Sequence, residues 1–223
     1  MNAKGLKDWA SSQDLSLSES QFASFSAFEA CLYEANEVMN LTRVPKEECW
    51  LRHFVDSLLF QDLIPQGAEV LDIGTGPGFP AWPLAVARPD LRVTALDSSG
   101  KMLGFLARFP LPNLTIAMVR AEEWGAREVF DFVTGRAVAP LTIQLELSAA
   151  PCKLGGFVVP MRTPADNLQV ATVATLGLRL EEVHRRILPQ SEIERVFPVY
   201  LKVGKTPSRF PRKWSEIRSK PLG

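Results

Sequence analysis

The hydrophobic pattern of this chain changes its period once, near residue 66. Before that point apolar residues recur at helical spacing over residues 19–39 and again over about 47–63. Ser18 or Ser20 is a candidate N-cap for the first of these helices, and Pro65 and Gly67 end the second. Residues from about 1 to 66 are therefore predicted to form a helical extension.

After residue 66 short apolar runs alternate with helix-compatible stretches, which is typical of parallel βαβ units in a doubly wound sheet. Strands are expected near 69–73, 92–96, 114–119, 130–134 and 155–161. Helices are expected at 81–88, 99–109, 140–151 and 165–176. Two further strands, 180–188 and 196–203, have a short connection, which favours an antiparallel hairpin at one sheet edge.

Composition limits the class of protein. The chain of 223 residues is 46% hydrophobic, enough to bury the core of one domain. It has no apolar run of membrane-spanning length and no signal-peptide pattern, so we expect a cytoplasmic protein without membrane contact, and a monomer. Its three cysteines are scattered and only His53 and His184 could assist them, so no metal site is predicted.

Charge is distributed unevenly along a chain whose formal net charge is zero. Residues 202–220 carry seven cations against Glu216 alone, a local net charge of +6. Such a basic end indicates a polyanionic partner, while a solvated tail is the alternative. Phe210 and Trp214 lie among these charges; we expect them to pack onto the domain, with stacking on an exposed base as the alternative.

A glycine-rich loop follows the first predicted strand, in the run Asp72-Ile-Gly74-Thr-Gly76-Pro-Gly78-Phe79. A dinucleotide fingerprint would need a third glycine at position 79, where Phe79 stands. The spacing D-x-G-x-G-x-G instead indicates S-adenosylmethionine, whose nucleoside can lie against bare backbone. Asp97, at the end of the second predicted strand, suits the two ribose hydroxyls of that cofactor.

Several further motifs complete a family pattern. They are Asn40-Leu-Thr42, Arg52-His-Phe-Val-Asp56-Ser57, Leu96-Asp97-Ser98 with Lys101, Ala121-Glu122, Arg136-Ala137, Gly155-Gly156, Phe210-Pro-Arg-Lys213 and Lys220-Pro-Leu222. In this order and spacing, from about residue 20 to 222, the chain resembles the RsmG (GidB) family of bacterial 16S rRNA guanine-N7 methyltransferases. The chain departs from the common family pattern at Ala81, at Gly135 and at Met161-Arg162, where the family often has Gly, Ser and Lys-Gly.

The resemblance implies an α/β fold of the class I S-adenosylmethionine methyltransferase type. We expect a Rossmann-like, mostly parallel seven-stranded sheet with an antiparallel edge hairpin and an N-terminal helical cap. The whole chain, 1–223, would form one methyltransferase domain, with its core at about 67–205 and a basic tail at about 206–223. The implied reaction is methylation of N7 of a guanine in the decoding-region loop of 16S rRNA, as naked RNA or in the small ribosomal subunit.

The candidate site residues follow from these motifs. Cofactor contacts are expected from Asp72, Gly74, Gly76, Gly78, Phe79, Asp97, Ser98, Ala121, Glu122 and Arg136. Contacts with substrate RNA are expected from Asn40, Arg52, His53, Arg209, Arg212 and Lys213. For Phe79, His53 and Glu122 the alternatives are a core aromatic, a boundary residue of the cap and a helix-start acid. Asp56 could pair with Arg52 four residues before it.

The chemistry predicted at the end of the fourth strand needs no general base. The segment Thr134-Gly-Arg136 lacks the Asn/Asp-Pro-Pro motif that aligns an exocyclic amine, and Cys152 is expected to be a buried thiol rather than a nucleophile. Guanine N7 carries a lone pair and no proton, so alignment and water exclusion are sufficient. Arg136 stays charged and would orient groups. A small-molecule methyltransferase of the same fold and a non-catalytic RNA-binding assembly factor remain the alternative functions.

Overall fold

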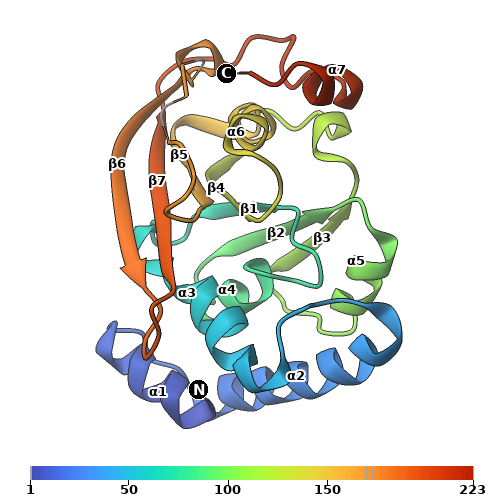
Figure 1. Cartoon of the computed structure of the whole chain (residues 1–223), viewed down its shortest axis with the longest axis vertical. Coiled ribbons are helices and arrows are strands. Elements are labelled where there is room, and N and C mark those ends of the chain that lie inside the picture. The colour runs from blue at the N-terminus through green and yellow to red at the C-terminus, as the bar shows by residue number, and fades with distance from the viewer. Residues whose placement is uncertain (1, 169, 172, 223) are drawn as a thin grey trace.

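The computed structural model describes residues 2–168, 170–171 and 173–222. They form a mixed sheet of seven strands in the order β3-β2-β1-β4-β5-β7-β6 (Figure 1). The strands are β1 Glu69–Ile73, β2 Arg92–Asp97, β3 Leu114–Met118, β4 Phe130–Arg136, β5 Cys152–Met161, β6 Leu178–Ile187 and β7 Glu194–Lys202. β1 to β5 are parallel, and β6 and β7 are antiparallel at one edge, as predicted.

Helices cover both faces of the sheet (Figure 1). They are α1 Ala3–Ser12, α2 Glu19–Met39, α3 Asp56–Leu58, α4 Ala81–Ala87, α5 Gly100–Leu106, α6 Leu141–Ala149 and α7 Trp214–Ser219. One core cluster joins α1 to α5 with Val70, Val93 and Phe132 of the sheet. The other joins α6 and the C-terminal segment with Leu71 and Val133 on the opposite face. The switch of face between neighbouring residues reflects the two-residue period of a strand.

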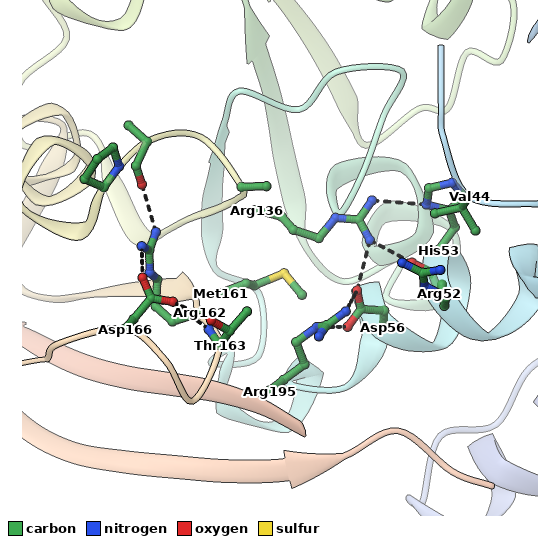
Figure 2. A pocket seen from close by; sticks show the side chains of 13 residues that line it. Val44, Arg52, His53, Asp56, Arg136, Met161, Arg162, Thr163, Asp166 and Arg195 are labelled. Atoms are coloured by element: carbon green, nitrogen blue, oxygen red, sulfur yellow. Dashed lines mark hydrogen bonds and ion pairs between the residues drawn. The ribbon is translucent and has the colours of Figure 1, made fainter. Parts of the chain in front are cut away.

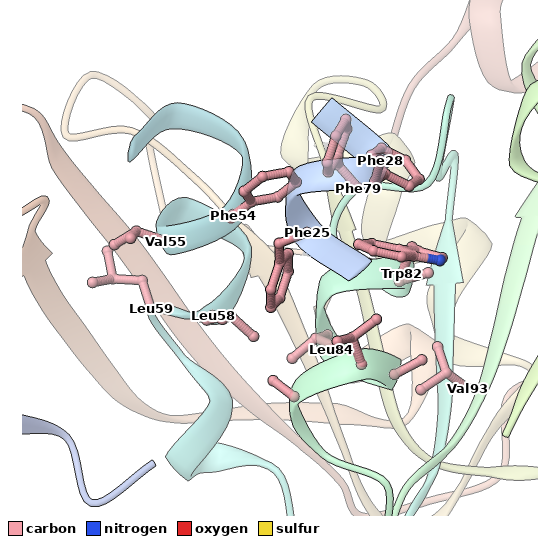
Figure 3. Close-up of a cluster of buried hydrophobic side chains, with 14 of the residues drawn as sticks. Phe25, Phe28, Phe54, Val55, Leu58, Leu59, Phe79, Trp82, Leu84 and Val93 are labelled. Carbon is pink, nitrogen blue, oxygen red and sulfur yellow. The ribbon is translucent and has the colours of Figure 1, made fainter. Parts of the chain in front are cut away.

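The N-terminal cap is fixed on the sheet by aromatic packing. α2 begins with a capping box in which Ser18 and Gln21 satisfy each other's backbone. Phe28 of α2 stacks on Trp82 of α4 at 4.2 Å between ring centroids and meets Phe79 of the glycine loop edge-on at 5.6 Å (Figure 3). The cap therefore packs directly against the loop that was predicted to bind the cofactor.

The structure differs from the prediction at three places. α1 was missed, because its buried contacts are few, chiefly Leu6 and Ala10. The second predicted helix is broken into η1 Lys46–Glu48, a π-helical turn η2 Trp50–Val55, α3 and η3 Gln61–Leu63. π-helical turns are rare in proteins, and where they occur they often lie at functional sites.

The predicted helix near 165–176 is wrong: among its described residues only η5 Val173–Leu176 forms a helical turn, of the 3-10 type. The side chain of Asp166 accepts hydrogen bonds from the backbone amide and hydroxyl of Thr163. An aspartate bonded to nearby backbone in this way favours a turn over a helix. Positions 169 and 172 of the prediction lie outside the described residues.

The C-terminal segment is folded onto the domain. Phe210 is 3% exposed and Ile217 is fully buried in the cluster around α6. Lys202, counted among the basic end, is 1% exposed and donates hydrogen bonds to the carbonyl oxygens of Ala149 and Leu176. Burial lowers its pKa to about 8. Lys202 thus does not belong to a surface that binds phosphates.

Among the described residues, no helix is both long and apolar enough to cross a membrane.

Candidate active site

The glycine loop crosses the carboxyl ends of β1 and β2. The backbone amides of Gly74 and Thr75 donate to the carbonyl of Leu96 at 2.7 and 3.1 Å, so the loop is bonded to the neighbouring strand. Gly74 has φ +70°, and a Cβ there would lie 3.0 Å from Val138. At Gly78, with φ +121°, a Cβ would lie 2.7 Å from Leu106. Side chains are therefore excluded at both positions by conformation and by contact.

A cleft of about 130 Å³ lies at this edge of the sheet. Its lining includes five of the ten predicted cofactor residues: Gly74, Asp97, Ser98, Ala121 and Glu122. Val138 and Trp214 also line it, and the sequence pattern did not identify either. Phe79, in contrast, is 3% exposed within the aromatic cluster, the alternative considered for it.

Asp97, the last residue of β2, is hydrogen-bonded to the glycine loop. Its carboxylate accepts hydrogen bonds from the backbone amides of Gly76 and Ser99, both at 2.8 Å. Glu122 lies across the cleft at the start of η4 Ala121–Glu123, where Arg120 donates to it at 2.6 Å. Two carboxylates thus face one cleft, an arrangement that suits the hydroxyl and amine donors of a nucleoside cofactor.

Asp72 lies fully buried beneath the loop. One carboxylate oxygen accepts from the amide of Ala81 at 3.0 Å, and the other has no hydrogen-bond partner among the described residues. Burial raises the pKa of Asp72 to about 7. Asp72 does not line the cleft, but in its ionised form its negative charge would favour a cofactor that carries positive charge.

Because the pKa of Asp72 is raised in the folded state, the free energy of unfolding should depend on pH. Below its unfolded pKa of 3.8 the group contributes fully to stability, and that contribution is lost as pH rises through about 7. The lowered pKa of His53 acts in the opposite sense. The difference in unfolding free energy between Asp72→Asn and the wild type should therefore grow in favour of the variant, by roughly 2 kcal/mol between pH 5 and 7. Urea denaturation of both proteins measures it; parallel pH profiles would contradict the expectation.

A larger pocket of about 620 Å³ adjoins the cleft, and Ala139 lines both (Figure 2). Four arginines from four separate segments converge on it: Arg52, Arg136, Arg162 and Arg195. Its volume lies within the range of small-ligand sites. We call this larger pocket the acceptor pocket.

Among the described residues, no group of three or more metal-ligating side chains could hold an ion.

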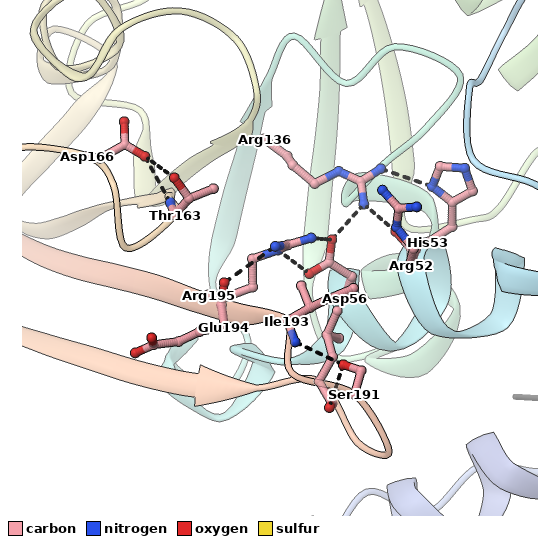
Figure 4. Close-up of polar contacts among 11 residues, drawn as sticks. Arg52, His53, Asp56, Arg136, Thr163, Asp166, Ser191, Ile193, Glu194 and Arg195 are labelled. Carbon is pink, nitrogen blue, oxygen red and sulfur yellow. Dashed lines mark hydrogen bonds and ion pairs between the residues drawn. The ribbon is translucent and has the colours of Figure 1, made fainter.

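Arg136, at the end of β4, is held by three acceptors of the cap (Figure 4). It donates to the carbonyl of Arg52 at 3.0 Å and to the Asp56 carboxylate at 3.1 Å. Its second terminal nitrogen lies 3.2 Å from Nδ1 of His53. Nε of Arg136 makes no hydrogen bond to a described residue, and the side chain lines the acceptor pocket.

The position of Arg136 fixes the protonation of His53. An arginine only donates, so Nδ1 of His53 must accept and Nε2 carries the proton, which faces the Thr42 hydroxyl at 2.8 Å. Burial, followed by the charges of Arg136 and Arg52, lowers the pKa of His53 to about 3. The imidazole stacks on Phe79 at 4.1 Å between ring centroids. His53 is thus a neutral residue that supports Arg136.

The partner of Asp56 was predicted wrongly. Arg52 pairs with Glu48 at 2.6 Å, while Asp56, 1% exposed, pairs with Arg136 and with Arg195 of β7 at 2.8 Å. The reason is burial: two arginines of the sheet surround the inward-facing carboxylate, and Arg52 extends toward solvent. Sequence reasoning missed Arg195 because 139 residues separate it from Asp56.

Gly135 and Arg162 are two of the positions at which the chain departs from the common family pattern. Both contact the side chain of Gln144. At Gly135 a Cβ would lie 2.6 Å from the Ile73 carbonyl oxygen and 2.8 Å from Gln144, so serine would not fit without movement. Gln144 donates to the Gly135 carbonyl at 2.9 Å and accepts from Arg162 at 3.0 Å. Arg162 also pairs with Asp166. The positive charge of Arg162 is therefore held at a fixed position in the wall of the acceptor pocket.

The remaining predicted RNA contacts lie outside the acceptor pocket. Asn40 is exposed and ends α2 in a left-handed conformation. Arg209 and Lys213 are exposed on the C-terminal segment. The guanidinium of Arg212 instead binds the fully buried Glu146 at 2.6 and 2.9 Å. Arg212 thus anchors the segment on α6.

Solved structures share this fold. M. jannaschii TYW2 in complex with AdoMet has a TM-score of 0.55 at 14% identity, covering 66% of this chain and 75% of that one. A SAM-dependent methyltransferase from Aquifex aeolicus has a TM-score of 0.53 at 15% identity, covering 69% and 93%. These likenesses establish the class I methyltransferase fold.

Closer relatives identify the family. A Ribosomal RNA small subunit methyltransferase G from Desulforamulus reducens is 36% identical, with 97% of each chain covered. The protein of the same name from Lactobacillus delbrueckii subsp. bulgaricus is 35% identical over the full length of both. Residues 21–191 match the model of the GidB family, described as rRNA small subunit methyltransferase G. This chain therefore belongs to the GidB family of small-subunit rRNA methyltransferases.

Proposed function

We propose that this protein transfers the methyl group of S-adenosylmethionine to N7 of a guanine in the decoding-region loop of bacterial 16S rRNA. Its family and its relatives' names support rRNA as the methyl acceptor and S-adenosylmethionine as the cofactor. The observation that carries the proposal is an acceptor pocket beside the cofactor cleft in which no described group is free to act as a base.

Each titratable acceptor in that pocket is occupied. His53 accepts from Arg136, and its pKa of about 3 keeps it neutral. Both oxygens of Asp56 are bonded to arginines. Although burial opposes it, bonds from Thr163 and Arg162 hold the pKa of Asp166 below its ordinary value. Guanine N7 needs no proton removed, whereas an exocyclic amine would.

Other base-methylation chemistries lack their groups. Cys152, whose thiol could mimic a cytosine-C5 nucleophile, is fully buried, and burial raises its pKa to about 12. It does not line the acceptor pocket. The thiolate is the reactive form, so Cys152 cannot supply a nucleophile there.

The protein's own residues would then act by alignment. When bound, S-adenosylmethionine supplies an electrophilic methyl group. Gly74 and Asp97 would hold it in the cleft, and Asp72 beneath the loop would balance its positive charge. Arg136 would orient the guanine or a phosphate from the wall of the acceptor pocket. Alignment of this kind, with water excluded, is worth several kcal/mol.

The proposal is tested by transfer of labelled methyl from S-adenosylmethionine to 30S particles and to naked 16S rRNA from a strain that lacks the homologous enzyme. We expect one new 7-methylguanosine by mass spectrometry of the digested RNA. A different methylated nucleoside, or cofactor binding without transfer to either substrate, would overturn the proposal. Comparing the two substrates shows whether the assembled particle is required.

If the protein were a small-molecule methyltransferase, the cations of the basic C-terminal segment would not contribute to substrate binding. Deleting residues 206–223 does not test this cleanly, because it also removes the buried Phe210 and Ile217. Neutralising exposed cations of that segment leaves the core intact. Such a variant should lose transfer to rRNA under the proposal and should keep full activity if the acceptor is a small molecule.

A further inference from the structure

The C-terminal segment from Lys205 to Lys220, here called the strap, is folded and carries α7 at one end of the molecule (Figure 1). Arg127 donates to the carbonyls of Thr206 and Phe210 at 2.7 and 2.9 Å, and Arg212 makes three hydrogen bonds to Glu146 of α6. Glu146 is fully buried, so this ion pair holds the strap at one defined place. The strap continues into α7, which has six residues.

Trp214, the first residue of α7, belongs to the wall of the cofactor cleft. The guanidinium of Arg120 lies 5.4 Å from the centroid of its ring. Arg120 also donates to Glu122, which lines the same cleft. A short contact path thus leads from the cofactor side of the cleft through Arg120 to α7.

The outer side of the strap is strongly basic. Five of its cations are exposed and form no ion pair with any described residue: Lys205, Arg209, Lys213, Arg218 and Lys220. Elsewhere most arginines are paired with a carboxylate, as Arg186 is with Asp62. Unpaired, solvated cations on one short segment are suited to a polyanion whose phosphates replace the counterions.

We propose that the strap, from Lys205 to Lys220, is a docking surface for the RNA phosphate backbone, and that its occupancy is positively coupled to occupancy of the cofactor cleft through Trp214. This rests on the proposed function and extends it to regulation of the same site. A six-residue helix is not stable alone, so α7 depends on its anchors. A cofactor that packs against Trp214 completes those anchors, and RNA then meets a surface that is already ordered.

Coupling of this kind must be reciprocal. In the wild type, saturating S-adenosylhomocysteine should tighten binding of a 16S rRNA transcript roughly tenfold, and the transcript should tighten binding of S-adenosylhomocysteine by the same factor. Isothermal titration and filter binding measure the two affinities. In Trp214→Ala the factor should fall to about one, while Trp214→Phe, which keeps a ring in the cleft wall, should retain most of it.

The docking surface is tested separately. Neutralising Lys213, Arg218 and Lys220 together should weaken RNA binding and reduce the slope of log affinity against log salt by about two to three, with unchanged affinity for S-adenosylhomocysteine in the absence of RNA.

A matched variant removes three exposed cations elsewhere that also form no ion pair with a described residue, Lys4, Lys46 and Arg108, and should leave the salt slope much closer to that of the wild type. Equal slopes for the two triple variants, or a coupling factor that survives Trp214→Ala, would overturn the inference. These measurements involve no methyl transfer. Failure of the enzyme to methylate 16S rRNA would therefore refute the proposed function without deciding whether the coupling exists.

Discussion

Replacing Arg136 with alanine is expected to lower kcat/KM for methyl transfer roughly a thousandfold, and by the same factor across the alkaline pH range. Arg136 is the only side chain that contacts both His53 and Asp56 of the cap from the end of β4 among the described residues. Its loss removes a positive group that stays charged throughout the usable pH range. The variant should fold, because Asp56 keeps its pairing with Arg195.

The pH profile decides between an orienting and a proton-transferring role. Initial rates for wild type and Arg136→Ala, measured from about pH 8 to 9.5 so that the titration of Asp72, whose pKa is about 7, contributes little, should give parallel curves. Arg136→Lys should recover only part of the activity, because an ammonium cannot reproduce the three fixed contacts of the guanidinium. Arg179→Ala, an exposed arginine of β6, serves as the control. Rescue of Arg136→Ala at raised pH would refute the orienting role.

Periodicity was sufficient for most of the fold. The change of period near residue 66 located all seven strands, and the short link between the last two predicted their antiparallel pairing. Where the prediction was wrong, local hydrogen bonding was stronger than the apolar pattern, as at Thr163 and Asp166. α1 was missed because it is short and mostly polar, with only Leu6 and Ala10 buried, although these residues share one face of the helix.

The candidate site could be predicted only in part. The glycine loop and Asp97 were predicted to lie together because strand ends meet at one edge of a parallel sheet, whereas Glu122 followed from the family resemblance; all three line one cleft. The contacts of Asp56 with Arg195 and of Glu146 with Arg212 span 139 and 66 residues. Such pairs depend on how layers pack, which a hydrophobic pattern does not encode. The place of Trp214 in the cleft wall was hidden for the same reason.

Removing the carboxylate of Asp56 is expected to destabilise the protein by roughly 3 kcal/mol and to lower kcat as well. Asp56 is 1% exposed and is the shared partner of Arg136 and Arg195. Asp56→Ala leaves both guanidiniums at the pocket without their counter-charge, and breaking such a pair costs far more than an exposed pair contributes. Arg136 would also lose one of the contacts that fix its direction.

A double-mutant cycle separates this effect from general damage to the fold. Urea unfolding of Asp56→Ala, Arg136→Ala and the double variant should show strong non-additivity, because the second substitution removes one of the charges that the first left unpaired. Glu48→Ala, which breaks the exposed pair with Arg52, should cost less than about 1 kcal/mol. Additive values in the cycle would mean that Asp56 acts independently of Arg136, through its pair with Arg195 or by packing. Non-additive values, with kcat lowered more than KM is raised, would establish the buried carboxylate as the group that holds Arg136 toward the acceptor.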